Sequence, residues 1–214
     1  MERPFLLYAA MVAPMLPIGV GLRKIKYLKS GMKVLLFFFI LDELLTAISY
    51  WLATYKSNNL WIIHADTILR LGAFGIAYSI WQTSRRARLV TGTLLGMFFV
   101  YWLWTTGYTS SLTQFENYSK SISKLLLAGL SCYMLYVLAN EENVDLFLLD
   151  RFWIVSGTVV YATGTLFLAA FGSTILGFNN ETFLKVWAVN WMLFIIANIV
   201  YTGGFLCSRP GNSS

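Results

Sequence analysis

Asp42, Glu43, Asp66 and Arg70 are ionisable residues inside long apolar stretches of this sequence, where charges are rare. Asp42 and Glu43 fall near the middle of one stretch, and Asp66 and Arg70 fall in the next. A charge at the centre of a bilayer costs a few kcal/mol or more, so it is usually retained for a partner or a role. Such groups relay protons, bind a polar ligand, or form an ion pair that fixes the register of two helices.

The spacing of these residues predicts that they meet. Asp66 and Arg70 are four residues apart, so on a helix they project from one face. The preceding stretch carries the other two carboxylates, and antiparallel packing of the two helices would bring Glu43 or Asp42 to the depth of Arg70. The sequence therefore predicts a buried cluster of carboxylates and arginine. This pattern fits both a functional site and a structural ion pair.

A second candidate site lies in the last apolar stretch. Trp187 and Trp191 are one helical turn apart, Asn190 is beside them, and Asn198 and Tyr201 follow deeper in the same stretch. Aromatic walls with a few polar contacts are typical of small-molecule pockets. Tryptophans near the end of a span also form interfacial belts, which is their commoner role. Both interpretations apply to this segment.

The remaining reactive side chains argue against catalysis. His64 is the only histidine, and together with Cys132 and Cys207 it cannot build a zinc site of the multi-histidine type. Ser131 has no residue that would orient it toward His64 as a nucleophile. A retinal protein needs a lysine midway along its seventh helix, whereas Lys185 lies at the mouth. Phosphate-binding glycine loops are absent. We therefore expect no enzymatic activity, no metal and no cofactor.

The composition predicts membrane-spanning helices that position these residues. Hydrophobic residues make up 57% of the 214 positions and charged residues 12%, which is too little polar surface for a soluble globule of this size. A span needs roughly 20 mostly apolar residues. Seven stretches qualify, at about 4–22, 34–54, 60–81, 89–108, 122–139, 152–172 and 183–207. We expect an all-α, polytopic membrane protein with a single seven-helix transmembrane domain over residues 1–214.

Basic residues are distributed unevenly between the predicted loops. One side carries Arg23, Lys24, Lys26, Lys29, Lys33, Arg85, Arg86, Arg88 and Arg209. The other side carries Arg3, Lys56, Lys120, Lys124 and Lys185. The positive-inside rule then predicts an N-terminus outside and a C-terminus in the cytoplasm. The net charge of +6 is a topology signal on this interpretation, with membrane lipid as the partner and no nucleic acid.

The loops also suggest an internal symmetry. The second and third stretches are joined by a short polar loop with Asn58 and Asn59, and the sixth and seventh by one with Asn179 and Asn180. Stretches of similar length flank both loops. This pattern suggests a layout of three helices, one linking helix and three helices, which occurs in transporters that bind substrate between repeats.

Several short segments resemble a known family. They are Leu41-Asp42-Glu43-Leu44-Leu45, the loop from Thr109 to Tyr118, Phe152-Trp153-Ile154, and Asn198-Ile199-Val200-Tyr201. The chain resembles a family of small, stand-alone bacterial membrane proteins with seven helices, common in Bacteroidetes. This resemblance implies a multi-pass protein of the bacterial inner (cytoplasmic) membrane, with a carboxylate at Glu43 and another near Asp66. Arg70 is less typical of the family, and the resemblance implies no activity.

Three functions fit these observations. The first is a receptor-like or sensory module that binds a small molecule or lipid in an outer-half pocket and acts through a separate cytoplasmic or membrane protein. The second is a small-solute transporter, proton coupling included, that uses the carboxylates at the midplane. The third is a structural or assembly subunit whose charges hold helices together. The side from which the site is accessible distinguishes the first two functions. A transporter must expose its site alternately to both sides of the membrane, whereas a sensory module needs a site open only outward.

Overall fold

The computed structural model describes residues 5–55, 57–109, 118–141, 145–171, 174–175, 177 and 180–208. The α-helices are α1 (Phe5–Val12), α2 (Met15–Arg23), α3 (Ser30–Thr54), α4 (Leu60–Trp81), α5 (Arg85–Trp104), α6 (Tyr118–Ala139), α7 (Asp150–Ala170) and α9 (Asn180–Cys207). Short helical turns lie at Ile25–Tyr27, Thr105–Thr109 and Leu146–Leu148. Every regular element in this part of the chain is helical, which confirms the all-α prediction.

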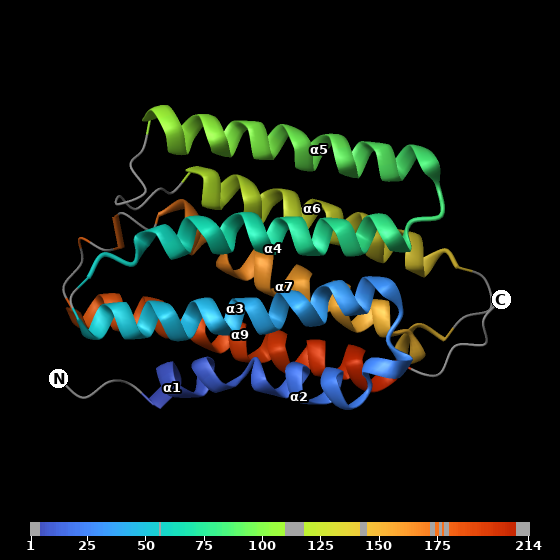
Figure 1. The fold of residues 1–214 in the computed structure, drawn as a ribbon, viewed down its shortest axis with the longest axis horizontal. Helices are drawn as coiled ribbons and strands as arrows, with labels where there is room; N and C mark the ends of the chain where they lie inside the picture. Colours follow the sequence, from blue (N-terminus) through green and yellow to red (C-terminus); the bar gives the residue numbers. More distant parts are fainter. Residues whose placement is uncertain are drawn as a thin grey trace.

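The long helices lie side by side, and consecutive ones run in opposite directions (Figure 1). Helix α5 forms one edge of the bundle and packs on α4 and α6. Helices α3 and α7 come next, and α1, α2 and α9 form the opposite edge. Helix α1 begins at one end of the long axis, and α9 ends at the other. The arrangement thus places α5 at the edge of the other helices, and the predicted layout of three, one and three helices stays a prediction.

The N-terminal segment is one predicted span but two helices. Pro14 precedes α2, and Pro17 stands in its first turn. A proline has no amide hydrogen to donate to the preceding turn, so a helix is interrupted there. The chain accordingly breaks at Ala13 and Pro14, with α1 packed on α9 and α2 packed on both α3 and α9.

Six helical stretches of the described chain are long and apolar enough to cross a membrane. They are Phe5–Arg23, Leu60–Trp81, Arg85–Gly107, Tyr118–Ala139, Asp150–Ala170 and Glu181–Cys207. Helix α3 is not among them; it is 25 residues long, carries Asp42 and Glu43 in its middle, and lies within the bundle. A multi-pass membrane protein is therefore supported, and the count of seven spans stays a prediction. Several helices begin earlier than predicted, because a hydrophobic window omits their polar first turns.

The ends of the bundle differ in charge. The turn from α2 to α3 lies at one end and carries Lys24, Lys26 and Lys29. The turn from α4 to α5 lies at the same end, and Arg85 and Arg86 follow it at the start of α5. We call this end the basic end. The turn from α3 to α4 lies at the opposite end, which we call the cavity end because the cavity described below opens there. The predicted shared side of these loops is confirmed.

Two lysines that the sequence places on the opposite side lie at that end of the bundle, within a helix. Lys120 and Lys124 belong to the first turns of α6, and Lys124 is buried, with 7% of its surface exposed. Arg3, Lys56, Arg209 and most of the loop from Thr109 to Tyr118 fall outside the described residues. The orientation of the bundle in a membrane stays a prediction.

Aromatic side chains fill the bundle between its middle and the basic end. Phe39, Phe74, Tyr78, Tyr201 and Phe205 are each at most 2% exposed. Their rings contact one another edge-on or tilted, with centroids 5.2 to 6.4 Å apart, the geometry that aromatic pairs prefer. We call these five residues the aromatic core. It joins α3, α4 and α9 between the predicted charged cluster and the basic end.

Candidate functional site

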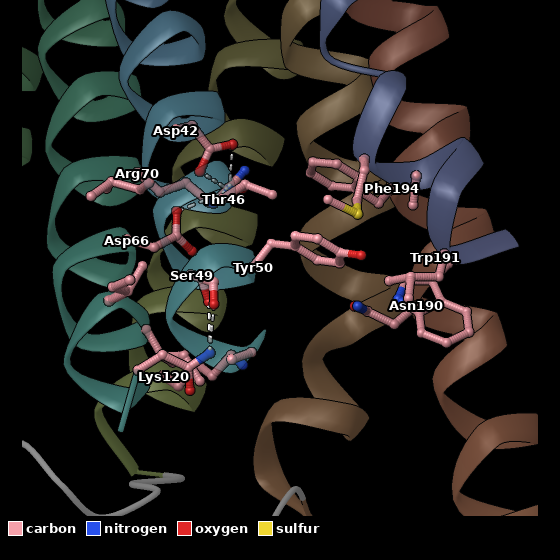
Figure 2. A pocket seen from close by; sticks show the side chains of 18 of the residues that line it. Asp42, Thr46, Ser49, Tyr50, Asp66, Arg70, Lys120, Asn190, Trp191 and Phe194 are labelled. Atoms are coloured by element: carbon pink, nitrogen blue, oxygen red, sulfur yellow. Dashed lines mark hydrogen bonds and ion pairs between the residues drawn. The ribbon is translucent and has the colours of Figure 1, made fainter. Parts of the chain in front are cut away.

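The predicted charged cluster forms between α3 and α4. The Nη2 atom of Arg70 donates to Asp42 Oδ1 at 3.0 Å and Oδ2 at 3.1 Å, and to Asp66 Oδ1 at 2.9 Å. Arg70 and Asp42 are buried, with 7% and 6% of their surfaces exposed. One guanidinium thus holds two carboxylates, one on each helix (Figure 2). We call this group the ion triple.

The turn between α3 and α4 sets the depth at which these residues meet. Asn59 Nδ2 donates to Ser49 Oγ at 2.9 Å and to the Ser49 carbonyl at 3.2 Å. Asn58 Oδ1 accepts from the amide of Leu60 at 2.9 Å, which satisfies one of the free N–H groups at the start of α4. These bonds hold the helical hairpin in one register, so Asp42 reaches Arg70.

Aromatic rings enclose the guanidinium of Arg70. Its Cζ atom lies 5.2 Å from the ring centre of Phe38, 5.4 Å from that of Tyr161 and 6.0 Å from that of Phe194. Cation–π attraction is strongest where the cation is removed from water. The Arg70 Nε atom is buried without a hydrogen-bond partner in the described part of the chain. The ion triple is therefore held by charge pairing and by rings from α3, α7 and α9.

Glu43 does not join the ion triple. Adjacent residues of a helix point about 100° apart, so when Asp42 faces Arg70 its neighbour faces elsewhere. Glu43 Oε2 is buried and accepts no hydrogen bond from the described residues. Of the two carboxylates that the sequence left as alternatives, Asp42 is the partner of Arg70.

A cavity of about 420 Å³ opens beside the ion triple toward the cavity end. Figure 2 shows Asp42, Asp66 and Arg70 on one wall and Asn190, Trp191 and Phe194 on the facing one. Apolar side chains make up much of the remaining lining: Leu7, Ala10, Met11, Leu45, Ala53, Ile62 and Ile63. Thr46, Ser49, Tyr50, Asn59 and Lys120 add polar groups. The cavity has the size and mixed lining of a small-molecule site.

A smaller cavity of about 80 Å³ adjoins the first one on the side of α6. Asp66, Arg70, Lys120, Tyr161 and Asn190 line both. The smaller cavity is further lined by Thr67, Ser123, Lys124, Leu127, Thr165, Leu168, Ala169 and Trp187. Because five residues are shared, the two cavities are close neighbours.

Lys124 is the most buried lysine of the described site. Its Nζ atom lies 3.6 Å from the ring centre of Tyr161, a close cation–π contact. Lys120, one turn earlier on α6, lines both cavities. Together with the ion triple, the site holds two carboxylates and three cations, a formal charge of +1.

The second predicted site divides into two parts. Asn190 and Trp191 line the larger cavity, and Trp187 lines the smaller, so the aromatic segment of α9 and the ion triple belong to one site. Asn198 and Tyr201 lie outside both linings. Asn198 Nδ2 donates to the Phe194 carbonyl at 2.8 Å, and the Tyr201 hydroxyl donates to Thr158 Oγ1 at 3.3 Å. They belong to the packing of α9.

Sequence reasoning missed the lysines of α6 and Tyr161 of α7. Lys120 and Lys124 are four residues apart, and Lys124 already fell inside the predicted stretch that began at residue 122. If both lysines had been counted as charges inside the membrane, the sequence would have predicted them as members of the charged cluster. Tyr161 carries no such signal, because a tyrosine in a span is common and its contact with two cations depends on packing.

The other reactive side chains lie apart from the cavities. His64 is buried but lines neither cavity. The Ser131 hydroxyl lies 2.8 Å from that of Tyr78, and not in a dyad with histidine. Cys132 and Cys207 are free thiols. Among the described residues no group of three or more metal-ligating side chains is close enough to hold an ion.

No family model, curated protein or solved structure matches this chain significantly. The resemblance to the seven-helix bacterial family therefore stays a prediction, and the site must be interpreted from its own geometry.

Proposed function

We propose that this chain is a receptor-like membrane protein of the bacterial inner membrane that binds a small molecule in the larger cavity. The supporting observation is a cavity of about 420 Å³ with a charged floor at the ion triple and a closely packed aromatic core beyond it. In the predicted orientation the cavity end faces outward. Ligands would reach the ion triple from outside or from the outer leaflet.

The packing favours access from one end. The ion triple lies midway along α3 and α4, and the aromatic core follows it toward the basic end with rings at most 2% exposed. Phe39 and Phe74, on α3 and α4, both contact Tyr201 of α9. A ligand seated on the ion triple is thus separated from the basic end by close-packed side chains.

Helix α9 connects the cavity to the basic end, where a cytoplasmic partner would bind. Trp191 lines the cavity, and near the other end of α9 the carbonyl of Leu206 accepts a hydrogen bond from the Lys24 ammonium. The Ser208 carbonyl accepts from the same ammonium at 3.2 Å. A ligand that shifts α9 would therefore move the basic turn between α2 and α3. Such a shift is the output that the proposal requires.

A small-solute transporter is the second candidate, and one observation favours it. The larger cavity is lined by α1, α3 and α4 from one group of helices and by α6, α7 and α9 from the other, with no lining residue from α5. Binding between two groups of three helices is the arrangement found in repeat-built transporters. Transport would require the aromatic core to open.

Native mass spectrometry in lipid nanodiscs tests ligand binding. We expect wild type to retain a small molecule that Trp191→Ala loses. Trp104→Ala is the matched control, since Trp104 lies on α5, is 60% exposed and lines neither cavity. Equal retention by both variants, or no retained molecule in wild type, would contradict the proposal. Loss of binding in both would point to a change in folding, which thermal unfolding would reveal.

Cysteine labelling distinguishes reception from transport. In a background with Cys132→Ser and Cys207→Ser, an impermeant maleimide is applied to either side of oriented vesicles that carry Ser49→Cys. Reception predicts labelling from the outer side alone. Labelling from both sides would favour transport. Thr158→Cys, at a buried position near Tyr201, reports whether the aromatic core itself opens.

A further inference from the structure

We infer that the ligand is an amphipathic molecule with one carboxylate, whose anionic head enters the smaller cavity and pairs with Lys124. This inference rests on the proposed function and names the class of ligand. The larger cavity would hold the apolar body. Four observations carry it: the burial of Lys124 without a close counter-ion, its neighbours, the size of the smaller cavity and the adjacency of the two cavities.

Lys124 differs from Arg70 in how its charge is compensated. Arg70 donates to two carboxylates at 2.9 to 3.1 Å. Only 7% of the surface of Lys124 is exposed. In the described part of the chain it makes no hydrogen bond and no salt bridge. Its close contact is with Tyr161, whose ring centre lies 3.6 Å from Nζ. Its electrostatic neighbours include the cations Arg70 and Lys120. The carboxylates of Asp42 and Asp66 attract it from a distance, but both are already bound to Arg70.

A buried charge without a close counter-ion is costly, because its hydration is lost and nothing replaces it. An anion beside Lys124 would remove that cost. A carboxylate, with one negative charge, matches the single ammonium of Lys124, whereas a phosphate monoester, with a charge of about −1.5 to −2 at neutral pH, exceeds it.

The lining of the smaller cavity suits a small oxyanion. Thr67 and Thr165 donate their hydroxyl hydrogens to backbone carbonyls of their own helices, at 2.8 and 2.6 Å. Ser123 and Asn190 make no hydrogen bond within the described residues, so their donors are available. With Lys124 they give an anion three donors from α6 and α9. A volume of about 80 Å³ admits a carboxylate in place of a few waters and excludes a bulky phospholipid head group.

The larger cavity adjoins the smaller one and offers an apolar surface. Tyr161 and Asn190 line both cavities, so a head at Lys124 leaves the attached chain among Ile62, Ile63 and Leu45. Leu7 and Met11 of α1 complete that surface. The apolar body of the ligand would thus occupy the larger cavity, and its anionic head would occupy the adjoining smaller one.

Binding of decanoate to the protein in nanodiscs tests the inference, with empty nanodiscs subtracted. We expect saturable binding to wild type, and binding weakened about tenfold or more in Lys124→Gln, since a hydrogen-bonded charge contributes about 1.5 to 3 kcal/mol. Lys185→Gln is the matched control, because Lys185 is exposed and pairs with Glu181 outside both cavities. Lys124→Arg should retain binding. Decanol, which lacks the charge, should bind wild type about tenfold or more weakly than decanoate.

The outcomes separate this inference from the proposed function. If decanoate and decanol bind wild type equally, or if Lys124→Gln binds decanoate as wild type does, the anionic head is refuted while ligand binding stands. Tighter binding of decyl phosphate than of decanoate overturns the carboxylate assignment. If no probe binds and wild type retains no molecule in native mass spectrometry, the proposed function fails as well. If the Lys124→Gln variant does not accumulate, the melting temperature of wild type serves instead. A rise with decanoate and not with decanol supports the anionic head, and an equal rise with both refutes it.

Discussion

The two halves of this bundle bury different kinds of polar side chain. In the half toward the basic end, the hydroxyls of Tyr78 and Tyr201 are paired with Ser131 and Thr158, and aromatic rings pack around them. In the half toward the cavity end, five charged side chains surround two cavities, with one more cation than carboxylates. A structural core satisfies its polar groups internally, whereas a binding site leaves some for a ligand. The comparison therefore separates scaffold from site within one bundle.

The largest expected effect comes from removing the shared cation. Arg70→Met leaves Asp42 and Asp66 buried without their partner, so we expect a loss of about 3 to 5 kcal/mol in the free energy of unfolding. Thermal unfolding in detergent measures it. The triple variant Asp42→Asn, Asp66→Asn, Arg70→Gln should recover most of the stability, because no charge is left unpaired. If Arg70→Met melts like wild type, charge pairing does not hold the cavity half together.

A smaller loss should follow from crowding the aromatic half. A Cβ atom added at Gly157 would lie 2.8 Å from the ring of Tyr201, so Gly157→Ala should cost about 1 to 3 kcal/mol through overpacking. Gly129→Ala is the control, since a Cβ there meets nothing within 4 Å. Equal melting of the two variants would show that the aromatic half is loosely packed. Decanoate binding by Gly157→Ala should match wild type below its melting temperature.

A single hydroxyl in the aromatic half should matter less. Tyr78→Phe removes the contact of 2.8 Å with Ser131, and one such hydrogen bond contributes about 1 kcal/mol. Denaturation of Tyr78→Phe, Ser131→Ala and the double variant would give the coupling directly. Purely additive losses would mean that the two hydroxyls do not stabilise each other.

The smallest effect should come from Glu43, which sharpens the assignment of the site. Because Glu43 Oε2 accepts no hydrogen bond from the described residues, Glu43→Gln breaks no specific contact there and should lower the free energy of unfolding by no more than about 0.5 kcal/mol. Asp42→Asn, one residue away, removes an ion pair and should cost about 1.5 to 3 kcal/mol. A larger loss from Glu43→Gln than from Asp42→Asn would reverse the assignment.

The sequence by itself determined the elements and the cluster. Apolar stretches of spanning length predicted helices, and the spacing of four residues between Asp66 and Arg70 placed both on one face, where they form an ion pair at 2.9 Å. Both inferences depend on local periodicity, which a sequence displays directly. The basic loops at one end follow from the same alternation of helix and turn.

Only the tertiary structure decided which residues complete the site. The choice of Asp42 over Glu43 depends on the rotation of α3 against α4, and a rotation of about 100° exchanges them. Tyr161 contacts both Arg70 and Lys124 because α6 packs on α4 and on α7, which brings together segments far apart in the chain. The separation of Asn198 and Tyr201 from the cavities has the same origin. Periodicity states which face a residue occupies, and only packing determines what that face touches.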